Sequence, residues 1–239
     1  MDLHDQTPKA DMAKLKLWNR WHALFLLACA APLLSHMNES WLLFTGSFSF
    51  LILLLVFRKE IANKRNWANW LTILRLIIIL IIGFGHRYFD DQMLFPMLCA
   101  IIILDGIDGQ VARYFKSTSS MSNYLDLEVG AFFVAVWSSL LYLHGYVDSW
   151  ILVVGFMRYS TVMVVYFLGW ENYREPRTRF ARTAVGFLSL SLISPLVFEA
   201  STYMPILIAA TIFITLAYSQ TFALMAKEAA QLATFKGDK

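Results

Sequence analysis

Three aspartates stand inside or beside long apolar segments in the stretch LDGIDGQVARYFKSTSSMSNYLDLEVG, residues 104–130. They are Asp105, Asp108 and Asp126. A carboxylate at membrane depth is costly, and where one occurs it usually marks a functional site. Carboxylate oxygens are also the ligands that hard cations such as Mg²⁺ and Mn²⁺ prefer. The chemistry that these residue types predict is therefore the binding of a divalent metal.

The first two acids share a helix face with two small residues and a cation. With about 100° per residue, the face that holds Asp105 also holds Asp108, Gly109, Ala112 and Arg113. Small residues let a ligand approach the helix backbone closely, and an arginine can bind a phosphate through two nitrogens. This face therefore predicts a site for a metal together with a phosphate-bearing ligand.

Less specific interpretations of the acids remain open. Asp126 could cap the next helix, and DGIDG, residues 105–109, could form a turn between two short helices. A transporter could use buried acids as a proton or ion relay. A calcium-binding EF-hand loop is excluded, because position 12 counted from Asp105 is Lys116 and not glutamate. Three acids and an arginine at helical spacing favour a functional site over helix caps.

The elements that must position these residues are membrane helices. Of the 239 residues, 58% are hydrophobic and only 15% are charged, against about 25% charged residues in soluble domains. The mean hydropathy is +0.56, and several apolar runs approach the roughly 20 residues that span a bilayer. We therefore predict an all-α, polytopic membrane bundle. Its apolar segments cover residues 21–35, 41–57, 70–85, 94–112, 125–143, 150–169, 184–198 and 204–224.

The basic residues orient these segments. Of the 20 lysines and arginines, 17 lie in the two terminal segments and in alternate connections, and such positions face the cytoplasm. The pattern predicts a multi-pass membrane protein with both termini in the cytoplasm. The expected location is the bacterial inner membrane. The stretch 104–130 then lies at the cytoplasmic ends of two helices. The net charge of +3 is explained by topology and by attraction to membrane lipids, so no nucleic-acid partner is expected.

The gapped pattern of residues 105–130 resembles the CDP-alcohol phosphotransferase family. That family carries D-x2-D-G-x2-A-R-x8-G-x3-D-x3-D, and six of these eight positions match here at the family's spacing. ANWLTILRL, residues 68–76, looks like the N-x-L-T-x-x-R opening of the family's first core helix. The resemblance covers roughly residues 66–225. A gapped pattern of this length is very specific.

The resemblance implies a fold, a reaction and partners. The six-helix core would be residues 66–225, preceded by an N-terminal segment and two additional helices in 1–65 and followed by a cytoplasmic tail, 226–239. The family transfers a substituted phosphate from a CDP-linked lipid, usually CDP-diacylglycerol, to an alcohol acceptor, and it releases CMP in phospholipid biosynthesis. A divalent metal, Mg²⁺ or Mn²⁺ and expected as two ions, serves as cofactor, and a homodimer is possible.

The resemblance also assigns roles residue by residue. The expected metal ligands are Asp105, Asp108 and Asp126. The residues that would line the substrate pocket are Gly109, Ala112, Arg113, Asn69 and Thr72. The four arginines that follow the sixth apolar segment could draw in an anionic acceptor, although plain cytoplasmic anchoring explains them equally well. They are Arg174, Arg177, Arg179 and Arg182. Arg158, inside that segment, has a better claim to a buried anionic partner.

Two residues depart from the family pattern. Ser122 replaces a glycine, a small change, whereas Gly130 replaces the last aspartate, which the family uses to hold a metal and as general base. Three explanations compete: an impaired member that still binds CDP-lipid, an active enzyme with a displaced base such as water or Glu128, or a residue changed in an otherwise active enzyme. Glu128 lies about 200° from Asp126 on a helix, which argues against that base.

Overall fold

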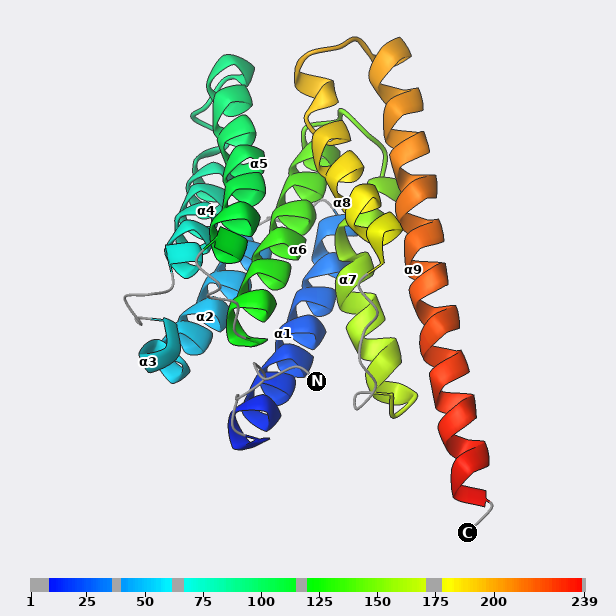
Figure 1. Ribbon diagram of the computed structural model, residues 1–239. Coiled ribbons are helices and arrows are strands. Elements are labelled where there is room, and N and C mark those ends of the chain that lie inside the picture. The colour runs from blue at the N-terminus through cyan, green and yellow to red at the C-terminus, as the bar shows by residue number, and fades with distance from the viewer. Residues whose placement is uncertain (1–8, 36–39, 62–66, 115–119, 171–177, 238–239) are drawn as a thin grey trace. The chain divides into compact units, whose positions relative to one another are not determined.

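The computed structural model describes residues 9–35, 40–61, 67–114, 120–170 and 178–237, but not the side chains of 9–11, 59–60, 67–68, 108–114, 120 and 232–237. Within these ranges the chain is helical and has no strand, which confirms the all-α prediction. The helices, shown in Figure 1, are α1 (Lys9–Leu34), α2 (Ser40–Val56), α3 (Arg58–Ile61), α4 (Trp67–Gly85), α5 (Asp91–Tyr114), α6 (Ser120–Leu143), α7 (Trp150–Phe167), α8 (Arg179–Ser191) and α9 (Ala200–Gly237).

Each predicted apolar segment overlaps one helix, but the seventh ends earlier than the prediction. The prediction extended it to residue 198, whereas α8 ends at Ser191 and is followed by a short 3₁₀ turn, Ser194–Leu196. Pro195 lies in that turn. Pro195 has no backbone N–H to donate to the carbonyl of Ser191 four positions earlier, which disfavours extension of α8 through this residue.

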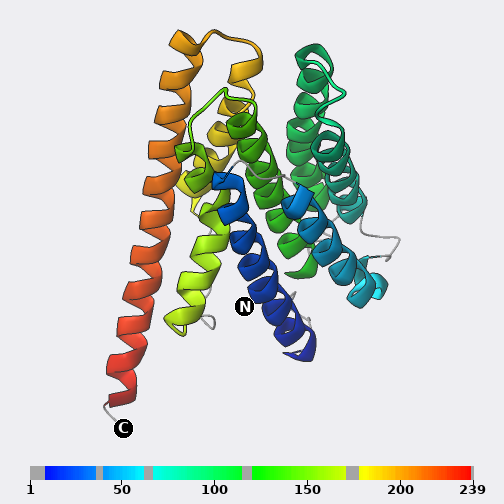
Figure 2. The same ribbon diagram turned by 180° about the vertical axis from the view of Figure 1, so that it is seen from behind.

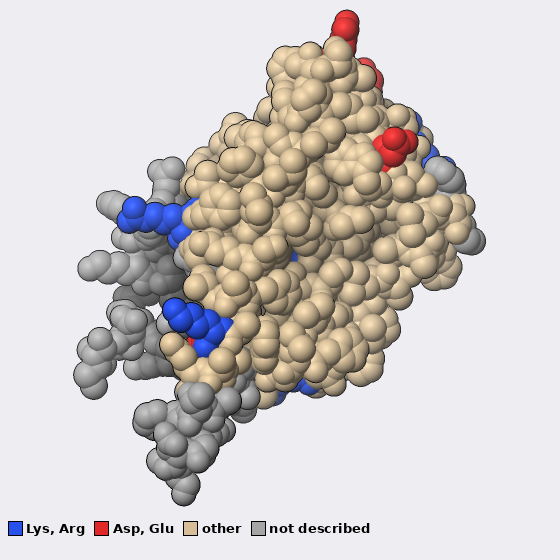
Figure 3. All heavy atoms as spheres, turned by 90° about the vertical axis from the view of Figure 1, so that its right-hand side faces the viewer, with Lys and Arg blue, Asp and Glu red and all other residues tan. Residues whose placement is uncertain are grey.

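Among the residues that the structure describes, three helical stretches are long and apolar enough to cross a membrane. They are Met121–Leu143, Trp150–Phe167 and Ala200–Gln231. In the last of these only 28% of the most apolar window is buried within the protein, so its apolar side chains need another apolar environment. The face drawn in Figure 3 is consistent with this, because its charged side chains lie mainly near the edges. The division into six core helices and two additional ones remains a prediction.

The chain divides into two compact units, residues 1–160 and 161–239. In the first unit, α4 and α5 form an antiparallel pair, and α4 also packs against α6 (Figure 1). Helix α4 therefore contacts both of the helices that follow it in the chain, α5 and α6. This arrangement brings the residues of α5 and α6 that precede and follow the connection 115–119 close to the middle of α4.

The N-terminal helices α1 and α2 form a second pair in this unit, visible from behind in Figure 2. The Trp18 indole N–H donates to the carbonyl of Ser49 at 2.9 Å, and His22 Nδ1 lies 2.8 Å from the Ser49 hydroxyl oxygen. Phe50 of α2 packs against Phe132 of α6, with ring centroids 5.3 Å apart. Helices α1 and α2 thus pack against α6, and α2 also packs against α4.

Gly46 of α2 faces the ring of Phe132 in α6 with no space for a side chain, and this predicts a stability effect. A Cβ atom at this position would overlap the ring of Phe132, which is fully buried and packed on Phe50, so it has no room to retreat. We expect Gly46→Ala to destabilise the protein by about 1–3 kcal/mol, the usual cost of overpacking. Thermal unfolding in detergent measures this. Gly186→Ala in α8, where a Cβ meets nothing within 4 Å, is the control and should not lower the melting temperature.

The second unit is a helical hairpin. Helices α8 and α9 lie side by side (Figure 1), and Phe187 of α8 meets Phe213 of α9 edge-on with ring centroids 5.8 Å apart. Thr178 begins α8, because its hydroxyl accepts a hydrogen bond from the backbone N–H of Ala181 at 3.0 Å. This cap satisfies one of the backbone donors that a helix N-terminus leaves unpaired.

Candidate functional site

Arg75 is the central residue of the candidate site. It lies midway along the apolar helix α4, and its side chain is only 2% exposed. It is the largest fully buried side chain among those that the structure describes. A buried charge of this kind is costly unless it is paired. The acidic residues that pair with Arg75 are therefore the first to consider as parts of a site.

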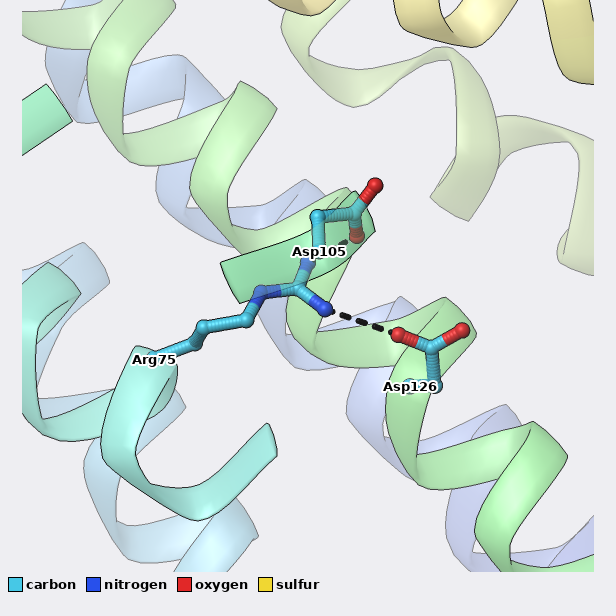
Figure 4. A network of polar contacts seen from close by, with 3 residues as sticks. All are labelled: Arg75, Asp105 and Asp126. Carbon is cyan, nitrogen blue, oxygen red and sulfur yellow. Dashed lines mark hydrogen bonds and ion pairs between the residues drawn. The ribbon is translucent and has the colours of Figure 1, made fainter. Parts of the chain in front are cut away.

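The guanidinium of Arg75 bridges Asp105 of α5 and Asp126 of α6. Its Nη2 lies 2.5 Å from Asp105 Oδ1, and its Nη1 donates to Asp126 Oδ1 at 2.8 Å. Figure 4 shows the three side chains converging from three different helices. Two acids that are 21 positions apart in the chain are thereby joined by a single cation. The structure thus brings together two of the three aspartates that the sequence singled out.

The two carboxylates and the arginine differ in their access to solvent. The side chains of Asp105 and Asp126 are 54% and 47% exposed, against 2% for Arg75. The guanidinium thus approaches the acids from the protein interior, and the acids keep an open side. A soluble ligand or ion can reach the carboxylates but not the arginine beneath them.

The helices that carry the acids rule out both structural alternatives raised above. Helix α5 continues without a break from Asp91 to Tyr114, so residues 105–109 are not a turn between two short helices. Helix α6 begins at Ser120, six residues before Asp126, so Asp126 is not its N-terminal cap. The common face of residues 105–113 requires a continuous helix, and α5 provides one.

The other predicted site residues are placed as follows. Asn69 and Thr72, on successive turns of α4 before Arg75, are buried with 1% and 2% of their surface exposed. In the part of the chain that the structure describes, neither polar atom of the Asn69 side chain has a hydrogen-bond partner. Ser122 is buried one turn before Asp126. The side chains of four further candidates lie outside the described residues: Asp108, Gly109, Ala112 and Arg113.

Gly130 lies beside the bridging arginine. A Cβ atom added there would be 3.7 Å from Arg75 Nη2, an ordinary van der Waals separation, and would meet no other described atom within 4 Å. The position follows Asp126 by one helical turn, and it faces the same guanidinium. A Cβ atom at residue 130 therefore has room beside the guanidinium.

Glu128 and Arg158 form a separate buried ion pair. Glu128 Oε1 accepts hydrogen bonds from Arg158 Nε at 3.2 Å and from Arg158 Nη2 at 2.9 Å. Glu128 is 0% exposed, so this carboxylate is not available as a displaced base in this conformation. The buried anionic partner expected for Arg158 is thus Glu128. Of the four arginines near residue 180, Arg174 and Arg177 lie outside the described residues.

The described acids fit a divalent cation by the chemistry of their donor atoms. Asp105 and Asp126 offer carboxylate oxygens on an accessible side, the ligand type that Mg²⁺ and Mn²⁺ prefer. Gly130 offers no donor. Among the described side chains, no cluster of three metal-binding residues occurs, and the side chain of Asp108 is not part of that set.

Arg75 is the residue to which sequence reasoning gave no role. It ends the N-x-L-T-x-x-R string and interrupts an apolar run, and both facts were visible in residues 68–76. The sequence did carry a signal, which is the free-energy cost of placing a charged side chain inside an apolar helix. Such an arginine is rarely tolerated without a function or a partner. Its partners belong to two other helices, and no local pattern names them.

Comparison with known proteins identifies one family. Its sequence profile, described as CDP-alcohol phosphatidyltransferase, matches residues 65–223, more than half of the chain. Neither the curated proteins nor the solved structures contain a match to the chain. The matched residues include every helix that contributes to the Arg75 cluster.

Proposed function

This chain belongs to the CDP-alcohol phosphatidyltransferase family, and we propose that it moves a substituted phosphate from a CDP-linked lipid to an alcohol acceptor. The family assigns it to phosphotransfer in lipid synthesis at a membrane. CDP-diacylglycerol is the donor that we expect, and CMP is the second product. The observation that supports the proposal best is the pair of accessible carboxylates, Asp105 and Asp126, held together by Arg75.

In this proposal the oxygen of the acceptor hydroxyl bonds to the lipid-bearing phosphorus as the bond from that phosphorus to CMP breaks. Asp105, Asp108 and Asp126 would hold Mg²⁺ or Mn²⁺, and the family resemblance implies two ions. A divalent ion bound there supplies positive charge that stabilises the diphosphate and the leaving CMP. The hydroxyl proton must pass to a base, and Gly130 cannot accept it.

The substrate pocket that we propose lies along α4 and α5. Gly109 and Ala112 would permit close approach of the CDP group, and Arg113 would bind a phosphate oxygen. Asn69 supports a polar ligand beside α4, because its buried amide has no partner in the described part of the chain and such groups are normally satisfied. Thr72 would lie in the same pocket.

A second candidate function is favoured by Gly130. The chain would then be an impaired member that binds metal and CDP-lipid but releases CMP slowly. The geometry supports this alternative in two ways. Residue 130 has room for a Cβ atom beside Arg75 but carries no carboxylate. The alternative acid in α6, Glu128, is fully buried against Arg158.

The wider organisation remains part of the proposal. We propose that residues 66–225 form the catalytic core, that 1–65 add two helices, and that 226–239 form a cytoplasmic tail. The site would then face the cytoplasmic leaflet of a bacterial inner membrane, with both termini in the cytoplasm. Assembly as a homodimer is consistent with the family resemblance.

A release assay tests the enzymatic proposal. Purified protein in detergent is mixed with CDP-diacylglycerol, Mn²⁺ or Mg²⁺, and a panel of polar alcohols, and CMP is quantified by chromatography. We expect release of CMP that requires the metal and one of the alcohols, and EDTA should stop it. Absence of CMP with every alcohol would reject turnover by this chain and leave the second candidate function.

A further inference from the structure

We infer that Arg75 is a positioning residue, which fixes Asp105 and Asp126 relative to each other so that both can bind one divalent ion. This inference rests on the proposed function, because it assumes that the two acids are metal ligands. It adds a role that no motif assigns. Arg75 would not touch the ion, and its effect would pass through the two carboxylates.

The geometry of the bridge is the first argument. Each Nη nitrogen of Arg75 serves a different acid, and in both acids the contacted atom is Oδ1. The remaining oxygen, Oδ2, is then the atom that would bind a metal. A guanidinium is planar and rigid, so the two contacts fix the direction of both carboxylates at once. A bridge of this type links Asp105 of α5 and Asp126 of α6 to the middle of α4.

Burial is the second argument, and it separates positioning from competition. If Arg75 occupied the metal's own position, it would share the accessible side of the acids. Instead its side chain is 2% exposed while those of Asp105 and Asp126 are about half exposed, at 54% and 47%. The guanidinium therefore lies behind the acids, and the accessible side remains for the ion.

Electrostatics supply the third argument. Two carboxylates on separate helices repel each other, and a cation between them offsets that repulsion before any metal arrives. Partners behind the metal ligands commonly orient them, and loss of such a partner typically lowers metal affinity by about 10- to 100-fold. The positive charge of Arg75 also repels a divalent cation. The change in metal affinity when Arg75 is replaced therefore decides between positioning, which predicts weaker binding, and competition, which predicts tighter binding.

Mn²⁺ affinity measured by electron paramagnetic resonance tests the inference without any turnover. The probe is Mn²⁺ alone, titrated into detergent-solubilised, monodisperse protein, and free Mn²⁺ is read from its six-line signal. Arg75→Lys keeps the charge but lacks the fork that reaches two acids, and Arg75→Gln removes the charge. We expect both variants to bind Mn²⁺ about 10- to 100-fold more weakly than the unaltered chain.

Arg158→Lys is the matched control, because Arg158 is also buried and ion-paired but contacts Glu128 outside the cluster. It should leave Mn²⁺ affinity within about twofold, since it contacts no proposed metal ligand. Tighter binding by Arg75→Gln would overturn the inference in favour of competition. Unchanged affinity of the folded Arg75 variants would reduce Arg75 to a structural residue and also overturn it.

Three further outcomes are defined in advance, and the last two keep the inference separate from the proposed function. If Arg75→Gln does not fold, Arg75→Lys decides the question alone. If the unaltered chain binds no Mn²⁺, the inference fails, and the proposed function must be revised to exclude a metal at this site. If the unaltered chain binds Mn²⁺ and the Arg75 variants bind it equally well, the inference alone fails and the proposed function stands.

Discussion

Replacement of Gly130 by aspartate should raise the rate of CMP release by about 10²- to 10⁴-fold, the usual contribution of a positioned general base. The added carboxylate would follow Asp126 by one helical turn, with its Cβ 3.7 Å from Arg75 Nη2. No described atom blocks it, so the variant should fold. The measurement is the initial rate of CMP formation from CDP-diacylglycerol at saturating Mn²⁺.

Gly106→Asp provides the matched control for this gain. It introduces the same side chain on α5, next to Asp105, at a position where a Cβ meets nothing within 4 Å. It does not face Arg75, so we expect no increase in CMP release. An equal gain from both variants would mean that extra negative charge, and not a base at residue 130, limits the reaction. A Gly130→Asp variant as slow as the unaltered chain would contradict the base assignment.

Replacement of Asp126 by asparagine should lower Mn²⁺ affinity by more than about 100-fold, beyond the effect expected for an outer partner such as Arg75. The change keeps the shape of the side chain and removes the charge that attracts the cation. It also removes one of the two acids that pair with Arg75, which leaves that buried guanidinium less well compensated. Titration with Mn²⁺ and thermal unfolding should therefore both respond.

The control for Asp126→Asn is Asp90→Asn. Asp90 lies just before the opposite end of α5, where its Oδ1 accepts a hydrogen bond from the backbone N–H of Met93 at 2.8 Å. Asparagine also caps helices well, so both the fold and Mn²⁺ affinity should remain unchanged. If Asp126→Asn bound Mn²⁺ as tightly as Asp90→Asn does, Asp126 would not be a metal ligand.

The parts of the fold that the sequence predicts are those with a local cause. An apolar run as long as residues 125–143 forms a helix in the protein interior or in the membrane, whichever helices lie beside it. Helix α6 covers that run. The end of α8 was missed because an apolar run continues past it to residue 198. Hydropathy does not register the backbone effect of Pro195, which stands in the 3₁₀ turn Ser194–Leu196.

The candidate site was predictable only in part. The helical spacing of Asp105 and Asp108 and the position of Asp126 are visible in one short stretch. The bridge from Arg75 joins α4 to two later helices, across 30 and 51 positions, and depends on how those helices pack. The same limit applies to Glu128. Helical spacing alone predicts that it points away from Asp126, but its ion pair with Arg158 depends on how α7 packs against α6 and is not visible in the sequence.

Binding of CDP-diacylglycerol is the most direct test of the central claim, because it applies whether the chain turns over rapidly or slowly. Fluorescent CDP-diacylglycerol is titrated into the unaltered protein in detergent with Mn²⁺, with EDTA, and with Mn²⁺ after Asp126→Asn. We predict saturable binding in the first case only. Binding that survives both EDTA and the loss of Asp126, or no binding under any condition, would contradict a metal-dependent CDP-lipid site at Asp105 and Asp126.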